Sequence, residues 1–138
     1  MRFQIFCVLF LASVAVLPAA HTDKSAITVD EPRYDPATEV SVLVVVSEVR
    51  DVPRGNPLNG IHLIARSEAQ ESQILDLYLG PTDFIKQFEI TFAKGDEAKV
   101  TGSKVKIASG PHLILVREIR KDSATLSCRR AKGVPNWE

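Results

Sequence analysis

The chain has 138 residues, of which 17 are Lys or Arg and 17 are Asp or Glu, so its formal net charge at pH 7 is zero. Because nucleic-acid-binding proteins usually carry a basic excess or a basic stripe, this balance disfavours a nucleic-acid partner. The two cysteines are Cys7, inside an apolar N-terminal run, and Cys128. A disulfide framework is therefore not expected, and a hydrophobic core must hold the fold.

The N-terminus has the pattern of a secretory signal peptide. A charged start precedes an apolar run from Ile5 to Leu17, which ends at Pro18-Ala19-Ala20. The run is shorter than the roughly 20 apolar residues that a membrane-spanning helix needs, and no second run follows. We expect residues 1–20 to be a signal peptide, cleaved after Ala19 or Ala20. The exported chain would be secreted or periplasmic, near neutral in charge and without a membrane span.

The next segment, residues 21–37, is polar and broken by Pro32 and Pro36. We interpret it as a flexible arm in front of a single domain at 38–138. That domain opens with a β-branched run, Glu39 to Val49, which predicts a strand covered on both faces.

Two further strands are predicted after a loop rich in turn-forming residues. The loop runs from Asp51 to Gly60, and the strands are Ile61 to Arg66 and Ile74 to Leu79. Their alternation separates two inward rows from one outward face. The inward rows are Ile61, Leu63, Ala65 and Leu75, Leu77, Leu79; the outward face carries His62, Ile64, Arg66, Asp76 and Tyr78.

The period then changes to that of a helix. Gly80-Pro81 precedes a short helical turn that should pack Phe84, Ile85 and Phe88 onto the sheet. The strand that follows changes parity between Val100 and Val105, so a bulge or bend is expected at Gly102. Two more strands are predicted, at Leu113 to Ile119 and at Ala124 to Cys128, before an aperiodic tail.

This order of elements predicts a mainly β fold, an OB-fold-like Greek-key barrel of five strands with one short helix between strands three and four. The rival architecture is an open β-sandwich with an incidental helix. Immunoglobulin-like sandwiches have seven or more strands and only about six are visible here, so the barrel is favoured.

Several short motifs also resemble those of small secreted bacterial proteins that have OB-fold-like barrels and no assigned activity. The resemblance spans Val40 to Trp137 and implies a fold and a compartment, but no catalytic residues. The departure from the group is Cys128-Arg129-Arg130, where an apolar residue, an arginine and an acid are usual. The motifs are Gly60-Ile61-His62-Leu63, Leu79-Gly80-Pro81 with Phe84, Lys94-Gly95-Asp96, Val100 to Val105, Val116 to Ile119, Thr125-Leu126 and Gly133-Val134-Pro135 with Trp137.

An OB-fold would place a ligand on the outward face of strands two and three. The candidate ligand-binding residues are therefore His62, Arg66, Asp76 and Tyr78. A small polar ligand, a saccharide or a protein edge would suit this face, and so would plain solvent. Trp137, the single tryptophan, either folds back to close one end of the barrel or anchors a partner.

Metal and redox chemistry are weighed against structural roles. His21, His62 and His112 are isolated in sequence, so no metal site or cofactor is predicted, although cleavage after Ala20 would make His21 an N-terminal copper ligand. Strand alternation sends Cys128 and Arg129 to opposite faces, which favours a structural, half-buried cysteine. No motif of a nucleophilic enzyme, a phosphate loop or a haem site is present.

The sequence thus favours a non-enzymatic exported module that binds an unknown protein or small polar ligand of the cell envelope. The binding surface would be the outer face of strands two and three with the Asp51–Asn59 loop. One alternative is a metal-handling or redox protein that uses His21 or Cys128. Another is single-stranded nucleic-acid or saccharide binding, by analogy of fold alone. The oligomeric state stays open.

Overall fold

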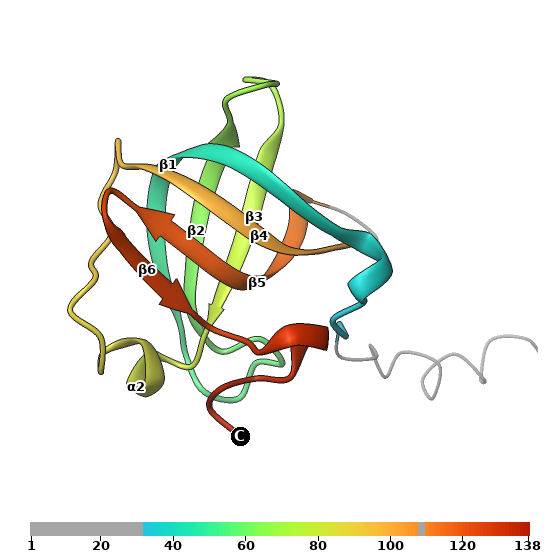
Figure 1. Ribbon diagram of the computed structural model, residues 1–138, viewed down its shortest axis with the longest axis vertical. Coiled ribbons are helices and arrows are strands. Elements are labelled where there is room, and N and C mark those ends of the chain that lie inside the picture. The colour runs from blue at the N-terminus through green and yellow to red at the C-terminus, as the bar shows by residue number, and fades with distance from the viewer. Residues whose placement is uncertain (1–31, 108–109) are drawn as a thin grey trace, which may run out of the picture. The chain divides into compact units, whose positions relative to one another are not determined.

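The computed structural model of the protein describes residues 32–107 and 110–138, and it consists mainly of strands (Figure 1). The predicted signal peptide, His21 and most of the predicted arm lie outside these residues. The strands are β1 (Glu39–Val52), β2 (Gly60–Ser67), β3 (Ile74–Gly80), β4 (Glu97–Val105), β5 (His112–Lys121) and β6 (Ala124–Ser127). The helical segments within these residues are α2 (Thr82–Ile85) and the 3-10 turns η2 (Pro36–Thr38) and η3 (Ala131–Gly133).

Five of the strands close into a barrel. β1 pairs antiparallel with both β2 and β4, β2 pairs with β3, and β4 pairs with β5. A parallel pairing of β3 with β5 completes the circle, and β6 adds to the outer edge of β5. These pairings, with α2 between β3 and β4, confirm the predicted OB-fold-like barrel and exclude the open sandwich.

Strand β1 pairs with β4 through its first half and with β2 through its second half, and it bends between them at a bulge. Its register on β2 shifts between Val46 and Glu48. The inward valines Val44 and Val46 are fully buried, as the alternation predicts. The outward row is not covered, since Leu43 is 54% exposed. The expectation that this strand is covered on both faces is therefore wrong at Leu43.

The predicted irregularity in β4 is confirmed at Gly102. The register of β4 on β5 shifts between Thr101 and Gly102. A Cβ atom at Gly102 would collide with the carbonyl oxygen of Leu115, so only glycine permits this close approach. Beyond the bulge the parity is reversed, and Val105 packs outside the barrel whereas Val100 packs inside it.

The apolar side chains form two clusters. The larger fills the barrel and includes both predicted inward rows except Ile61, which packs at its margin. The smaller lies on the outer face of β3 and β5, where Tyr78, Leu113 and Leu115 are buried. Three peripheral segments cover it, through Tyr34, Leu58 and Trp137. The outer cluster explains why part of the outward face does not meet solvent.

The helical turn is shorter than predicted. Only Thr82–Ile85 is helical, and Ile85 is its buried residue. Phe84 packs at the margin of the barrel core, but Phe88 is 40% exposed, with its ring 5.1 Å from that of Phe84 between centroids. The prediction that Phe88 packs onto the sheet is wrong, because the helix ends before its spacing can carry that side chain inward.

The structure also places the end of the predicted flexible arm against the barrel. Tyr34 packs in the outer cluster, and its hydroxyl donates to Oε2 of Glu39 at 2.6 Å. The amide of Asp35 donates to Oγ of Ser103 at 3.0 Å. Residues 34–37 therefore belong to the domain, since these contacts fix the chain before β1 begins. No helix in the described part of the chain is long and apolar enough to cross a membrane.

Candidate functional site

Strands β2 and β3 bring the four predicted site residues onto one face. In the pairing register His62 lies opposite Tyr78, Ile64 opposite Asp76, and Arg66 opposite Ile74. The residues differ in exposure, however. Arg66 is exposed and Asp76 is half-buried, whereas His62 and Tyr78 are buried. The predicted face is therefore divided into an open part and a covered part.

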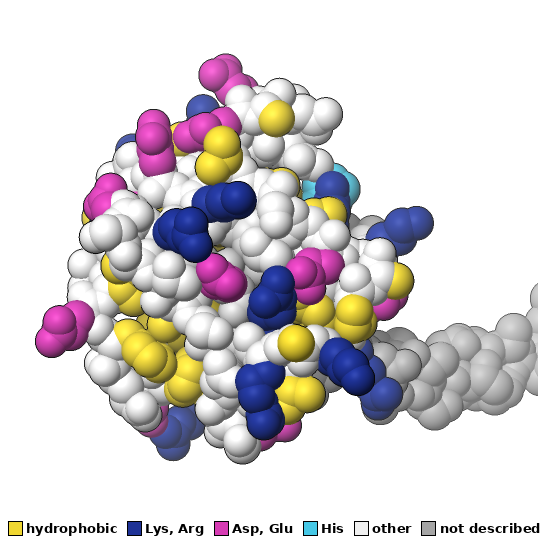
Figure 2. Space-filling view, viewed as in Figure 1, with side chains coloured by type: hydrophobic (Ala, Val, Ile, Leu, Met, Phe, Trp, Pro, Cys, Tyr) yellow, Lys and Arg dark blue, Asp and Glu magenta, His cyan; other side chains and the backbone are white. Residues whose placement is uncertain are grey.

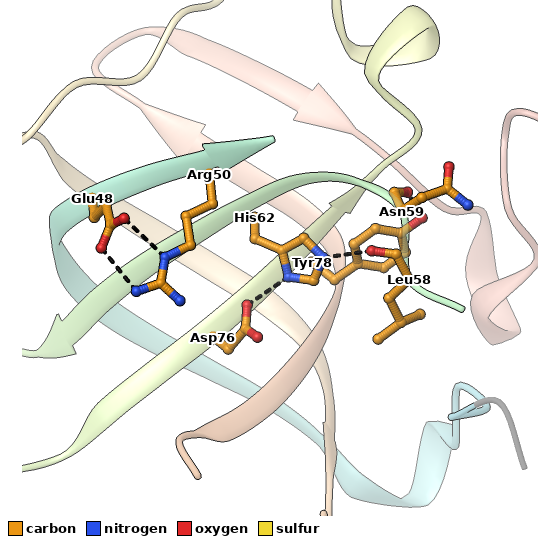
Figure 3. Close-up of polar contacts among 7 residues, drawn as sticks. All are labelled: Glu48, Arg50, Leu58, Asn59, His62, Asp76 and Tyr78. Atoms are coloured by element: carbon orange, nitrogen blue, oxygen red, sulfur yellow. Dashed lines mark hydrogen bonds and ion pairs between the residues drawn. The ribbon is translucent and has the colours of Figure 1, made fainter. Parts of the chain in front are cut away.

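His62 is held by hydrogen-bond acceptors on both sides of its ring (Figure 3). Nδ1 lies 2.7 Å from Oδ1 of Asp76, and Nε2 lies 2.6 Å from the carbonyl oxygen of Leu58. Neither the carbonyl nor an ionised carboxylate can donate, so the ring satisfies both contacts only when both nitrogens carry hydrogen. This geometry selects the imidazolium form.

The pKa of His62 agrees with that assignment. Burial acts to lower the pKa, but the hydrogen bonds to Asp76 and to the Leu58 carbonyl outweigh burial, and the net shift is upward. Arg50 acts against them through its charge, while its guanidinium is engaged by Glu48 at 2.9 and 3.0 Å.

Tyr78 holds the same loop at the neighbouring residue. Its hydroxyl donates to the carbonyl oxygen of Asn59 at 2.9 Å, and its ring centroid lies 5.0 Å from that of His62. Together the two side chains fasten consecutive carbonyls of the β1–β2 loop to the barrel. In the covered part of the face, these two hydrogen bonds therefore hold the protein's own loop against the barrel.

Trp137 folds back onto the barrel. Its ring lies 5.5 Å from Phe84 and 6.2 Å from Tyr78, measured between centroids, and it covers Gly80. A Cβ atom at Gly80 would lie 2.8 Å from Cζ3 of Trp137. The ring therefore packs between α2 and the outer cluster, so it folds back onto the barrel as one of the two sequence alternatives had it.

A comparison with protein-family models relates the chain to a known family. The model of the MamS/MamX magnetosome protein family matches residues 44–126. The chain belongs to this family. The matched range begins within β1 and ends within β6, so it includes β2 to β5 and α2 in full. No curated protein and no solved structure matches the chain. The expected relationship to bacterial proteins is confirmed at the level of this bacterial family.

The MamS/MamX family member has its one described cysteine deep in the barrel core. Cys128 is fully buried, and burial raises the pKa of its thiol to about 12. A thiol with such a pKa is scarcely ionised at neutral pH, which argues against nucleophilic or redox chemistry there. The sequence predicted a half-buried cysteine, and the barrel covers it completely.

Arg129 is a buried cation, whereas the sequence marked it only as a neighbour of Cys128. Its guanidinium carbon lies 5.0 Å from the ring centroid of Trp137 and 5.7 Å from that of Tyr34. Nη1 donates to the carbonyl oxygen of Gly133 at 2.9 Å. Burial lowers the pKa of Arg129. No local pattern could have revealed this arrangement, because Tyr34 and Trp137 come from opposite ends of the domain.

The two histidines in the described part of the chain, His62 and His112, do not form a metal site. Both nitrogens of His62 are engaged, His112 is exposed at the start of β5, and His21 lies outside the described residues. Within residues 32–107 and 110–138, no three side chains of His, Cys, Asp or Glu are placed to hold a metal ion.

Proposed function

We propose that the protein is an exported, non-enzymatic binding module whose partner docks on the open part of the outward face. We call this surface the docking face, and it consists of Leu43, Ile64, Arg66, Ile74 and Asp76. Two apolar side chains, Leu43 and Ile74, are 54% and 36% exposed on it, with the guanidinium of Arg66 opposite Ile74. The observation that carries the proposal is this combination of exposed apolar groups with charge on a rigid sheet.

The cross-strand rows support a protein partner. Val45, Arg66 and Ile74 lie side by side across β1, β2 and β3, and Glu48, Ile64 and Asp76 form the next row. Apolar groups therefore alternate with charges of both signs. Such a mosaic suits a protein surface with complementary charges better than a nucleic acid, whose bases need exposed aromatic side chains.

The state of the reactive side chains supports a non-enzymatic role. Catalysis by a thiol needs an accessible group of low pKa, and Cys128 is buried with its pKa raised. General acid–base catalysis by His62 would need one free ring nitrogen, and both nitrogens are within hydrogen-bond distance of an acceptor.

The family supplies the setting of the proposal. MamS/MamX is named as a magnetosome protein family, and we extend that setting to this chain. The apolar N-terminal run predicts export, so the partner would be a protein that is exposed outside the cytoplasm.

Site-specific photo-crosslinking in the living cell tests the docking face. A photoreactive phenylalanine analogue at Arg66 or Ile74 should give one discrete adduct. The same analogue at Lys86, which is exposed just after α2, should not give it. Adducts from Lys86 alone, or none from either position on the docking face, would overturn the proposal.

A further inference from the structure

A groove opens at the end of the barrel that faces away from α2. α2 contacts β2 and β3 where β2 begins and β3 ends. The groove lies at the other end, with a volume of about 450 Å³, between the start of β1 and the end of β4. One wall holds Ala37 to Val40, and the other holds Lys104 to Lys106 with His112. Figure 2 shows basic, histidine and hydrophobic side chains together at the right-hand edge of the view.

The groove begins where two strands separate. The last pair between β1 and β4 is Glu39 with Ser103, after which the chain of β1 is replaced by the turn η2. β4 continues for two more residues and stays paired with β5 as far as Val105. On the β1 side, in the part of the chain that the structure describes, this last stretch of β4 has no strand beside it. An open strand edge of this kind can accept an extended peptide.

The unpaired charges that line the groove are all positive. Lys104 and Lys106 form no ion pair with any described residue. The carboxylate on the facing wall, Glu39, is occupied by Arg117 at 2.8 and 3.2 Å and by the hydroxyl of Tyr34. An incoming acidic group would therefore meet two unpaired ammonium groups beside the apolar side chains of Val40 and Val105.

We propose that this groove binds an extended acidic peptide segment of a partner protein, which pairs as a short strand with the edge of β4 at Lys104–Lys106. Alternate side chains of the peptide would be apolar, on the face of Val105, and acidic, on the opposite face with the two lysines. The site is separate from the docking face and stands whether or not that proposal holds.

Two other occupants fit the charges less well. A second copy of the chain pairing through the same edge would bring the lysines of both copies together. A membrane with anionic headgroups would also meet Glu68 and Glu71, which lie in the β2–β3 loop at the same end of the barrel. An acidic peptide confined to the groove avoids both the repulsion between lysines and the repulsion by Glu68 and Glu71.

The test uses the full chain and three synthetic peptides labelled with a fluorophore. The first alternates glutamate and valine over seven residues, the second replaces glutamate by lysine, and the third replaces valine by proline, which cannot pair with a strand edge. The proposal requires that the first peptide binds at least tenfold more tightly than the other two, measured by fluorescence anisotropy. Amide NMR signals of Lys104 to Lys106 should shift on its addition.

Variants locate the site. The double change Lys104→Glu with Lys106→Glu should weaken binding of the first peptide at least tenfold. The matched change Lys99→Glu with Lys86→Glu, which alters two exposed lysines elsewhere, should stay within twofold of the parent. Circular dichroism checks that both variants fold.

The proposal is overturned if the first peptide does not bind or if its affinity survives the Lys104 and Lys106 changes. Equal binding of the proline peptide would reduce the interaction to charge attraction and would also overturn it. Retention on vesicles of anionic lipid, without peptide binding, would assign the groove to a membrane surface instead.

Discussion

At the scale of single residues, solvent exposure separates the roles of the polar side chains on the outward face. His62 and Tyr78 were predicted as ligand contacts because they alternate outward, yet each is bonded to a carbonyl of the β1–β2 loop. Arg66, on the same face, remains exposed. These neighbouring side chains therefore do not form one binding site. His62 and Tyr78 hold the loop, whereas Arg66 is free to meet a partner.

His62 makes the stability of the protein depend on pH. Its pKa is raised in the folded state, so its contribution to stability is fully present below its unfolded pKa and is lost as the pH rises through the folded pKa. We expect His62→Gln to cost about 1–3 kcal/mol of unfolding free energy at pH 5.5 and clearly less at pH 9, because glutamine cannot carry the charge. Urea unfolding of both proteins at the two pH values measures the difference.

A difference between the two proteins that does not change with pH would contradict the imidazolium assignment. The direct check is nitrogen NMR of the ring. Below the raised pKa, both Nδ1 and Nε2 of His62 should carry slowly exchanging protons, while the exposed His112 serves as the internal control.

At the scale of elements, two glycines place strands and tail in contact. Gly102 lets β4 cross β5 at the bulge, and Gly80 ends β3 beneath the ring of Trp137. The second contact joins β3 to the C-terminal tail, which has no regular pattern in sequence. The tail is thereby part of the barrel's packing.

The cost of adding one methyl group tests this contact. Gly80 has φ +148°, and a Cβ atom there would lie 2.8 Å from the ring of Trp137, whereas Gly55 has φ +99° and its Cβ atom would meet nothing within 4 Å. Both alanine variants incur backbone strain of about 1–2 kcal/mol, but Gly80→Ala must also displace the ring. We expect Gly80→Ala to lose at least about 1 kcal/mol more than Gly55→Ala, with a shift in tryptophan fluorescence. Equal losses and unchanged fluorescence would contradict the packing of Trp137.

At the scale of the whole molecule, the two ends of the domain meet on the outer cluster. Tyr34 precedes β1, and Gly133 and Trp137 follow β6, yet Arg129 stacks on both aromatic rings. A Cβ atom at Gly133 would collide with the ring of Tyr34. The segment before β1 and the tail therefore stabilise each other as well as the barrel face beneath them.

Removing Tyr34 should therefore destabilise the whole domain. We expect Tyr34→Ala to cost about 2–4 kcal/mol, because a large half-buried ring and its contacts with Gly133 and Arg129 are lost. Arg33→Ala, one residue away and exposed, should change stability by less than about 0.5 kcal/mol. Thermal unfolding followed by circular dichroism measures the stability of both variants. Similar stability of the two would contradict the stabilising contacts of Tyr34 with Gly133 and Arg129.

The sequence by itself determined the barrel. Alternation of apolar residues located each strand, the parity change marked Gly102, and the helical spacing after Gly80 placed α2 between β3 and β4. These signals are local, because strand and helix periods are set by neighbouring residues.

Only the tertiary structure decided which outward side chains meet solvent. The loop carbonyls at Leu58 and Asn59, the ring of Tyr34 and the tail at Trp137 cover half of the predicted face, and each comes from a segment without periodicity. The open edge of β4 likewise depends on where β1 stops pairing. Burial is a property of segments distant in sequence that meet in space, so the spacing of residues along one strand cannot report it.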